Sequence, residues 1–272
     1  MNIRTNCRLD GGHVPAKGIY RDYDLFAWFY NRYWDRKYHS QALPVLDELV
    51  LLRLPANAWI LDLCCGTGHL ARILSGRGFR VTGIDGSREM LRYARENVPD
   101  GEFIAADARS FNLPPIFQAI VSTFESLNHI SSVGELTMVF HNAHAALIEN
   151  GLFVFDLIME EAYLTRWGKS SAIVEKDNVC VVRGGYNPAV RIGRTDITMF
   201  RLDGNWRRSD VTLLQRCYSE EEVRSALELT GFSGIRLFRA GRDFSMPGDL
   251  GTGRTFFLAT KESSVEERAE AS

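Results

Sequence analysis

The sequence WILDLCCGTG occupies residues 59–68 and carries the strongest structural signal in the chain. An apolar run from Trp59 to Leu63 leads directly into a glycine turn, which is typical of a buried parallel strand that precedes a helix. Because glycine has no Cβ, Gly66 and Gly68 would let a ligand approach the backbone closely. Two glycines alone would equally suit a tight turn that binds nothing.

Outward from this turn, strand-like and helix-like segments alternate from residue 59 to residue 157. This alternation predicts an α/β fold with a doubly wound, mostly parallel sheet covered by helices on both faces. The further predicted strands are 79–84, 103–106, 119–122 and 152–157. The predicted helices are 69–76, 88–97 and 132–148, with an N-cap at Ser87, a capping box at Ser132–Glu135 and a stop at Asn150-Gly151.

The segments on either side of this region have different patterns. Residues 20–38 are densely aromatic with helical spacing, and a second helix is predicted over 41–53. The β-type segments 173–183, 194–202 and 207–218 follow one another without a helical pattern, and Asp203-Gly204-Asn205 marks a hairpin turn. A helix at 220–230 and a hairpin of 235–239 with 255–260 close the fold. We therefore divide the chain into an N-terminal arm and cap helix (1–40), a cofactor-binding α/β core (41–160), an antiparallel β insertion (161–218), the end of the core (219–261) and a disordered tail (262–272).

The composition is that of an ordinary globular protein. The chain has 272 residues, a formal net charge of −2 and 45% apolar residues, so nothing global favours binding to nucleic acid. No apolar run is long enough to span a bilayer, and the N-terminus lacks the apolar segment of a signal peptide. Five cysteines without a paired metal-type spacing favour free thiols in the cytoplasm. We expect a cytoplasmic monomer or homodimer with no nucleic-acid, membrane or metal partner.

Three acids stand at the ends of three successive predicted strands. Asp62, just before the glycine turn, would repel a pyrophosphate but attract a cationic amino-acid group. Asp85 could accept both hydroxyls of a ribose, and Asp107 with the N–H of Ala108 could read the edge of an adenine. Parallel strands end on one rim of a sheet, so the three carboxylates should converge there. The string GTGHLA at 66–71 also fits the fingerprint of a nicotinamide-dependent dehydrogenase, and that alternative stays open.

Four segments together resemble the class I S-adenosylmethionine-dependent methyltransferases that act on small molecules. They are ILDLCCGTGHLA (60–71), VTGIDGSREMLRYAREN (81–97), FIAADARSF (103–111) and FQAIVSTFESLNHI (117–130). The resemblance covers about 20–160 and implies a seven-stranded Rossmann-like sheet, the cofactor S-adenosyl-L-methionine and a small-molecule methyl acceptor.

The resemblance also implies roles for individual residues. Cys64 stands where a first glycine is common, and we interpret it as a loop residue. The methionine part of the cofactor would be surrounded by Asp62, Cys64, Gly66 and Gly68, and the ribose would be held by Asp85. The adenine would be bordered by Gly86, Ser87 and Met90, and its edge would be read by Asp107 and Ala108, with Arg109 nearby. Phe124 would flank the cofactor. The Tyr-x-x-x-Ala-x-x-Tyr pattern from Tyr23 to Tyr30, with Trp34, resembles the N-terminal helix that folds over the cofactor in this family.

Methyl transfer needs in-line alignment, exclusion of water and, for some acceptors, a base. The tentative catalytic candidates are His129 and Glu125, with Asn128 nearby and Asp156 as a further acid on the rim. The insertion would cover the acceptor, and its candidate contacts are Arg183, Tyr186, Arg191, Arg194 and Trp206.

The leading interpretation is therefore transfer of a methyl group to a small-molecule N or O acceptor by in-line displacement. Methylation of nucleic acid is disfavoured because the segment after the fourth strand reads STFESLNH, without an aromatic–proline element. A non-catalytic S-adenosylmethionine-binding protein and the nicotinamide-dependent dehydrogenase remain alternatives.

Overall fold

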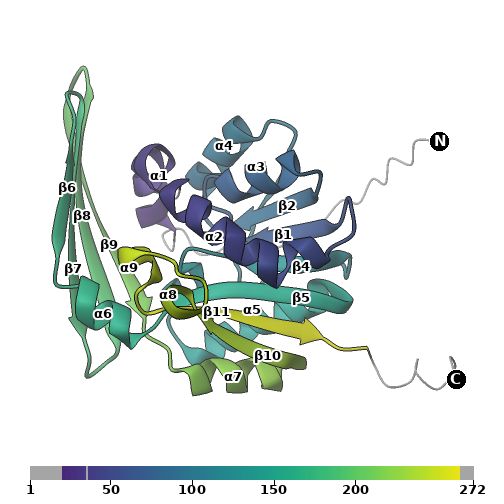
Figure 1. Ribbon diagram of the computed structural model, residues 1–272. Coiled ribbons are helices and arrows are strands. Elements are labelled where there is room, and N and C mark those ends of the chain that lie inside the picture. The colour runs from purple at the N-terminus through teal and green to yellow at the C-terminus, as the bar shows by residue number, and fades with distance from the viewer. Residues whose placement is uncertain (1–19, 35, 264–272) are drawn as a thin grey trace, which may run out of the picture.

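The computed structural model describes residues 20–34 and 36–263 of the chain. Our expectations for the arm at 1–18 and for the tail beyond residue 263 concern residues outside that part. The described residues form a seven-stranded sheet and a four-stranded sheet. Figure 1 shows the smaller sheet standing beside the α/β core, with helix α1 (Arg21–Tyr33) near its inner side.

The seven-stranded sheet has the strand order β10-β11-β5-β4-β1-β2-β3. Strands β1 to β5 are parallel, and β11 runs antiparallel to both β5 and β10. The predicted doubly wound, mostly parallel sheet is thereby confirmed. The chain moves outward to one side through β2 and β3 and to the other through β4 and β5, so the order reverses between β1 and β4, where such sheets bind ligands. The strands are β1 (Trp59–Leu63), β2 (Arg80–Asp85), β3 (Glu102–Ala105), β4 (Phe117–Ser122), β5 (Leu147–Ile158), β10 (Phe232–Arg239) and β11 (Arg254–Lys261).

Successive side chains of the central strands pack into two separate hydrophobic clusters. On β1, Leu61 and Leu63 belong to one cluster and Ile60 belongs to the other, as the two faces of a strand require. The sheet is covered on both faces, as the alternation of the sequence predicts. The helices on the first face are α5 (Val133–Ala146) and α7 (Glu220–Leu229), and those on the second are α2 (Arg36–Leu49) and α3 (His69–Gly76).

The predicted serine caps form. The Ser87 hydroxyl accepts from the Met90 N–H at the start of α4 (Arg88–Asn97), and the Ser132 hydroxyl accepts from the Glu135 N–H. The second cap is not a full capping box, because the Glu135 carboxylate accepts from Ser131 and Arg109 instead. The complete box lies at Ser219 and Glu222, at the start of α7.

The insertion is antiparallel, as predicted, but it has four strands and begins with a helix that the sequence reasoning missed. The segment expected at 173–183 is in fact two strands, and Gly204 turns the hairpin between the last two. Phe26 and Phe29 of α1 pack against this sheet in a cluster with Ile197. The elements are α6 (Glu160–Arg166), β6 (Ser170–Val174), β7 (Asn178–Asn187), β8 (Ile192–Asp203) and β9 (Asn205–Arg216).

Three other boundaries differ from the prediction. The helix expected at 41–53 begins at residue 36 and ends at Leu49, followed by the 3₁₀ turn η1 (Leu51–Arg53). Asn150-Gly151 does not end a helix but lies in an irregular stretch of β5, where Asn150 has a φ of 62° and the register against β4 shifts. Strands β10 and β11 pair antiparallel, as predicted, and the connection between them contains two short helices that were not predicted, α8 (Ala240–Asp243) and α9 (Gly248–Gly251).

Candidate functional site

A cavity of about 690 Å³ opens at the carboxyl ends of the central strands, between the core, α1 and the second sheet. Of the predicted site residues, those that line it are Tyr23, Tyr30, Trp34, Cys64, Gly66, Asp85, Gly86, Met90, Ala108, Arg109, Phe124, Glu125 and His129. Those that lie behind its wall are Asp62, Gly68, Ser87 and Asp107.

The glycine turn after β1 is bonded to the end of β2. The Gly66 N–H donates to Asp85 Oδ2 at 2.9 Å, and the Ser87 N–H donates to Asp85 Oδ1 at 2.8 Å. A Cβ on Gly66 would lie 3.4 Å from the ring of Tyr30, so the turn and α1 approach each other closely. Burial raises the pKa of Asp85 to about 6, although the backbone N–H groups oppose this rise.

Asp62 lies beneath the same turn, 2% exposed, and its Oδ2 has no hydrogen-bond partner among the described residues. Burial, and secondly the charge of Asp85, raises the pKa of Asp62 to about 7. A buried carboxylate oxygen without a partner is costly unless a cation or donor reaches it. This oxygen therefore suits the cationic group that the sequence analysis expects nearby.

Asp107 is held by Arg109, whose Nη2 lies 2.6 Å from Asp107 Oδ2. Burial alone would raise the pKa of Asp107, but the hydrogen bonds from Arg109 outweigh it and hold that pKa below its usual value. The hydroxyl of Tyr20 also donates to Asp107, and a Cβ on Gly86 would lie only 2.2 Å from the Tyr20 ring. The slot between Gly86 and Asp107 thus holds a flat ring that carries a hydrogen-bond donor. An adenine is likewise flat and carries a donor. Sequence reasoning placed Tyr20 in the aromatic run without assigning it to the site.

An acid of helix α1 bonds the helix to the core. Asp24 Oδ1 accepts from the Ser87 hydroxyl at 2.6 Å and from the Glu89 N–H at 3.2 Å, at the start of α4. An acid at this place also favours the helix electrostatically. The spacing of Tyr23, Phe26, Tyr30 and Trp34 then brings these four side chains to the cavity.

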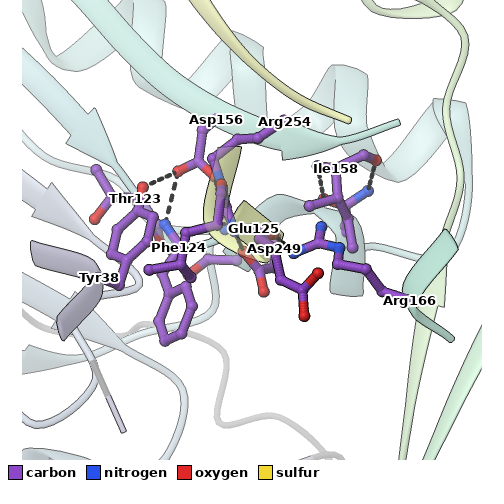
Figure 2. A network of polar contacts seen from close by, with 12 residues as sticks. Tyr38, Thr123, Phe124, Glu125, Asp156, Ile158, Arg166, Asp249 and Arg254 are labelled. Atoms are coloured by element: carbon purple, nitrogen blue, oxygen red, sulfur yellow. Dashed lines mark hydrogen bonds and ion pairs between the residues drawn. The ribbon is translucent and has the colours of Figure 1, made fainter. Parts of the chain in front are cut away.

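The turn after β4 has a strained backbone, because Phe124 and Glu125 are consecutive left-handed residues with φ of 63° and 50°. The carboxylate of Asp156 accepts both of their N–H groups, at 2.7 and 3.1 Å, and also the Tyr38 hydroxyl at 2.8 Å. Arg254 forms ion pairs with both Asp156 and Glu125 (Figure 2).

Arg254 and Asp156 are completely buried, whereas the Glu125 side chain is 16% exposed and lines the cavity. Burial raises the pKa of Asp156, and the charge of Arg254 opposes that rise. The sequence predicted Asp156 to be a further acid on the rim, but the structure places it underneath, where it supports the turn. Asn128 is likewise buried, and its amide bonds to the backbone of Ile158 and Arg216.

His129 lines the cavity, with Nδ1 2.9 Å from the Leu214 carbonyl oxygen. A carbonyl can only accept, so Nδ1 carries the proton and Nε2 accepts from the Gln215 amide at 3.2 Å. Burial lowers the pKa of His129 to about 4, so the ring is neutral at pH 7. Its lone pair is occupied by Gln215, which makes His129 a poor base unless that bond breaks.

None of the five insertion residues expected as acceptor contacts lines the cavity. Side chains alternate along a strand, and Val182 and Gly184 face the cavity while Arg183 between them does not. Arg166 and Trp167, at the end of α6, line the cavity instead and were missed. A helix could have been recognised there from the acids in its first turn and Arg166 in its last. The five expected acceptor contacts that do not line the cavity are Arg183, Tyr186, Arg191, Arg194 and Trp206.

The model of a methyltransferase domain family matches residues 60–151. YqeM of Bacillus subtilis (strain 168) is 28% identical over 219 residues, which are 78% of this chain and 87% of that protein. The dTDP-3-amino-3,4,6-trideoxy-alpha-D-glucopyranose N,N-dimethyltransferase of Streptomyces venezuelae is 32% identical over 163 residues, covering 59% of this chain and 66% of that one.

Two solved structures show the same fold over nearly the whole chain. An S-adenosylmethionine-dependent methyltransferase from Clostridium acetobutylicum ATCC 824 has a TM-score of 0.71 at 22% identity, covering 89% of this chain and 99% of its own. CalS10 from Micromonospora echinaspora, an amino pentose methyltransferase bound to S-adenosylmethionine, has a TM-score of 0.67 at 24% identity, covering 87% and 96%.

Residues 60–151 form a methyltransferase domain, and the fold over most of the chain is that of S-adenosylmethionine-dependent methyltransferases. These findings agree with the resemblance drawn from the four sequence segments, and they support S-adenosyl-L-methionine as the cofactor. The cavity fits such a cofactor in its acids, its glycine turn and its flat slot. Within residues 20–34 and 36–263 of the methyltransferase, no helix is both long and apolar enough to cross a membrane.

Proposed function

We propose that this methyltransferase transfers a methyl group to an amine of a small molecule bound between the core and the second sheet. The observation that carries the proposal is the continuity of the cavity, which runs from Asp85 and the glycine turn past Glu125 to the inner face of β7–β9. A cofactor at one end and an acceptor at the other would then meet beside the turn after β4.

The roles at the cofactor end follow from the donors and acceptors on the cavity wall. Asp85 accepts the ribose hydroxyls, and the slot between Gly86 and Asp107 takes the adenine once Tyr20 withdraws its ring. Asp62 provides negative charge beneath the amino-acid part. The rings of Tyr23 and Tyr30 close the site over the cofactor and exclude water.

S-adenosyl-L-methionine supplies an electrophilic methyl group on a sulfonium, so the protein has mainly to align the acceptor and keep water out. An amine needs only to be bound in its neutral form, whereas a hydroxyl needs a base. His129, one of the two expected catalytic residues, is neutral, but its lone pair accepts a hydrogen bond from Gln215 and so is not free to act as a base. Glu125 is the acid that lines the cavity at this point, and it can bind an ammonium group and take a proton from it.

The relatives favour the same class of acceptor. The Streptomyces venezuelae relative and a Streptomyces fradiae protein that is 32% identical over 121 residues are both N,N-dimethyltransferases of dTDP-linked amino sugars, and CalS10 is an amino pentose methyltransferase. We therefore place amino sugars first among the acceptors to be tested.

Calorimetric titration with S-adenosylhomocysteine tests the cofactor end. We expect Asp85→Ala to weaken binding by about 1.5–3 kcal/mol, because hydrogen bonds to a charged group are lost, while Asp100→Ala, at an exposed loop acid, leaves it unchanged. Release of S-adenosylhomocysteine with a panel of dTDP-linked amino sugars, and not with their hydroxyl counterparts, tests the acceptor. Binding of NAD in place of S-adenosylhomocysteine would overturn the proposal.

A further inference from the structure

The backbone after β4 adopts a conformation that its own residues disfavour. Phe124 and Glu125 carry side chains, yet both are left-handed, a conformation adopted readily only by glycine. Such strain persists only where surrounding contacts enforce it, and it concentrates at functional sites. Here the contacts come from Asp156, which receives both N–H groups of the strained pair.

Arg254 fixes the second half of this arrangement. One end of its guanidinium pairs with Asp156 and the other with Glu125 Oε2, while its Nε donates to the Leu250 carbonyl oxygen at 2.8 Å. The guanidinium lies 4.7 Å from the centre of the Tyr38 ring, which stacks on Phe124 at 4.4 Å. Arg254 therefore cannot turn without breaking contacts on every side.

The result is that the carboxylate of Glu125 has a fixed position at the cavity wall. Arg254 occupies Oε2, which leaves Oε1 as the oxygen available to a ligand. Figure 2 shows Glu125 below Asp156 and Arg254 and beside the side chain of Asp249, with Arg166 further along. Asp156 and Arg254 are too deeply buried to touch a ligand themselves.

We propose that Asp156 and Arg254 are positioning residues of the methyl-transfer site, which hold Glu125 so that its free oxygen receives the acceptor's ammonium group. This inference rests on the proposed function, because it takes the acceptor to be an amine. In the reaction Glu125 first takes up a proton from the ammonium nitrogen. The lone pair that this frees forms the new N–C bond, and the electron pair of the broken C–S bond stays on sulfur.

The probe for the test is methylammonium chloride, added to the full-length protein saturated with S-adenosylhomocysteine and followed by amide NMR shifts of the turn. We expect saturable binding that falls at least tenfold in Glu125→Gln, Asp156→Asn and Arg254→Lys. Glu161→Gln, which removes an exposed acid on α6 outside the cavity, should bind the probe like the unaltered protein.

Affinity for S-adenosylhomocysteine separates positioning from a merely structural role. It should stay within about twofold in the variants, whereas a general loss of structure would lower both affinities together. Glu125→Gln leaves Arg254 paired with Asp156 in the interior, so it keeps the test decisive if Arg254→Lys does not fold. This inference alone would be overturned if methylammonium did not bind the unaltered protein, or if it bound Glu125→Gln, Asp156→Asn and Arg254→Lys as tightly as the unaltered protein. Failure to bind S-adenosylhomocysteine would instead overturn the proposed function.

Discussion

At the residue scale, the two acids nearest the glycine turn hold unfavourable positions. Burial raises the pKa of Asp62 from 3.8 to about 7 and that of Asp85 to about 6. An acid whose pKa is higher in the folded state binds more protons there, so its contribution to stability is present below the unfolded pKa and declines as pH rises toward the folded value. The protein without cofactor should therefore lose stability between about pH 4 and pH 7 from these two groups.

Asp62→Asn should stabilise the cofactor-free protein at pH 8 by about 1–3 kcal/mol, because it removes a buried charge with an unpartnered oxygen. The gain should shrink as the pH falls below 7, where Asp62 itself becomes protonated. Urea denaturation at pH 8 and pH 5 measures both values, with the exposed Asp100→Asn as the control. A variant that is less stable than the unaltered protein at pH 8 would show that Asp62 has a partner we have not identified.

At the scale of elements, one arginine on β11 joins three parts of the core. Arg254 reaches Asp156 at the end of β5 and Glu125 after β4, and both Arg254 and Asp156 are fully buried. A buried ion pair adds little net stability compared with apolar packing, but removal of one partner leaves an uncompensated charge. The stability of this turn should therefore depend strongly on Arg254.

We expect Arg254→Ala to lower the free energy of unfolding by about 3–5 kcal/mol, because two carboxylates lose their cation. Arg208→Ala breaks an exposed ion pair with Asp210 on β9 and should leave the free energy of unfolding almost unchanged. Equilibrium denaturation of the two variants compares the costs directly. Equal costs would mean that water or another cation replaces Arg254.

At the scale of the whole molecule, α1 joins the core to the second sheet. Asp24 docks it on α4, while Phe26 and Phe29 pack with Ile197 and Met199 of β8. The cavity lies between the core, α1 and the second sheet. Its closure therefore depends on a seam of contacts that lie partly behind its wall, such as those of Phe29 and Met199.

Phe29→Ala changes this seam without touching the cavity, since Phe29 is 2% exposed and does not line it. The local cost should approach the 3–5 kcal/mol typical of a buried phenylalanine, expressed as faster amide exchange in α1 and β7–β9 and weaker retention of S-adenosylhomocysteine. Leu25→Ala, at an exposed position of the same helix, should have neither effect. Faster exchange spread equally over β1–β5 would contradict the idea of a separate seam.

Much of the core could be predicted because its signals are local. The strand before Gly66 and the caps at Ser87 and Ser132 depend on residues within one or two turns of each other. Helix α6 was not predicted, and Asn150-Gly151 was predicted to end a helix although it lies in β5. The residues of both segments suit the predicted conformation as well as the observed one, and tertiary packing decides between the two. The same limit applied to the insertion, where the strand segments were recognisable but the face turned to the cavity was not.

The sequence by itself indicated the family, the succession of strands and helices along the core and the acids at the ends of its strands, because periodicity, glycine turns and strand-end positions act over short stretches of chain. Only the tertiary structure decided that Tyr20 fills the slot beside Asp107, that Asp156 lies beneath the site and that Arg254 holds Glu125. Arg254 and Glu125 are 129 positions apart. Their pairing depends on β11 lying next to β5 and β5 next to β4, and no local pattern encodes which buried side chains then meet.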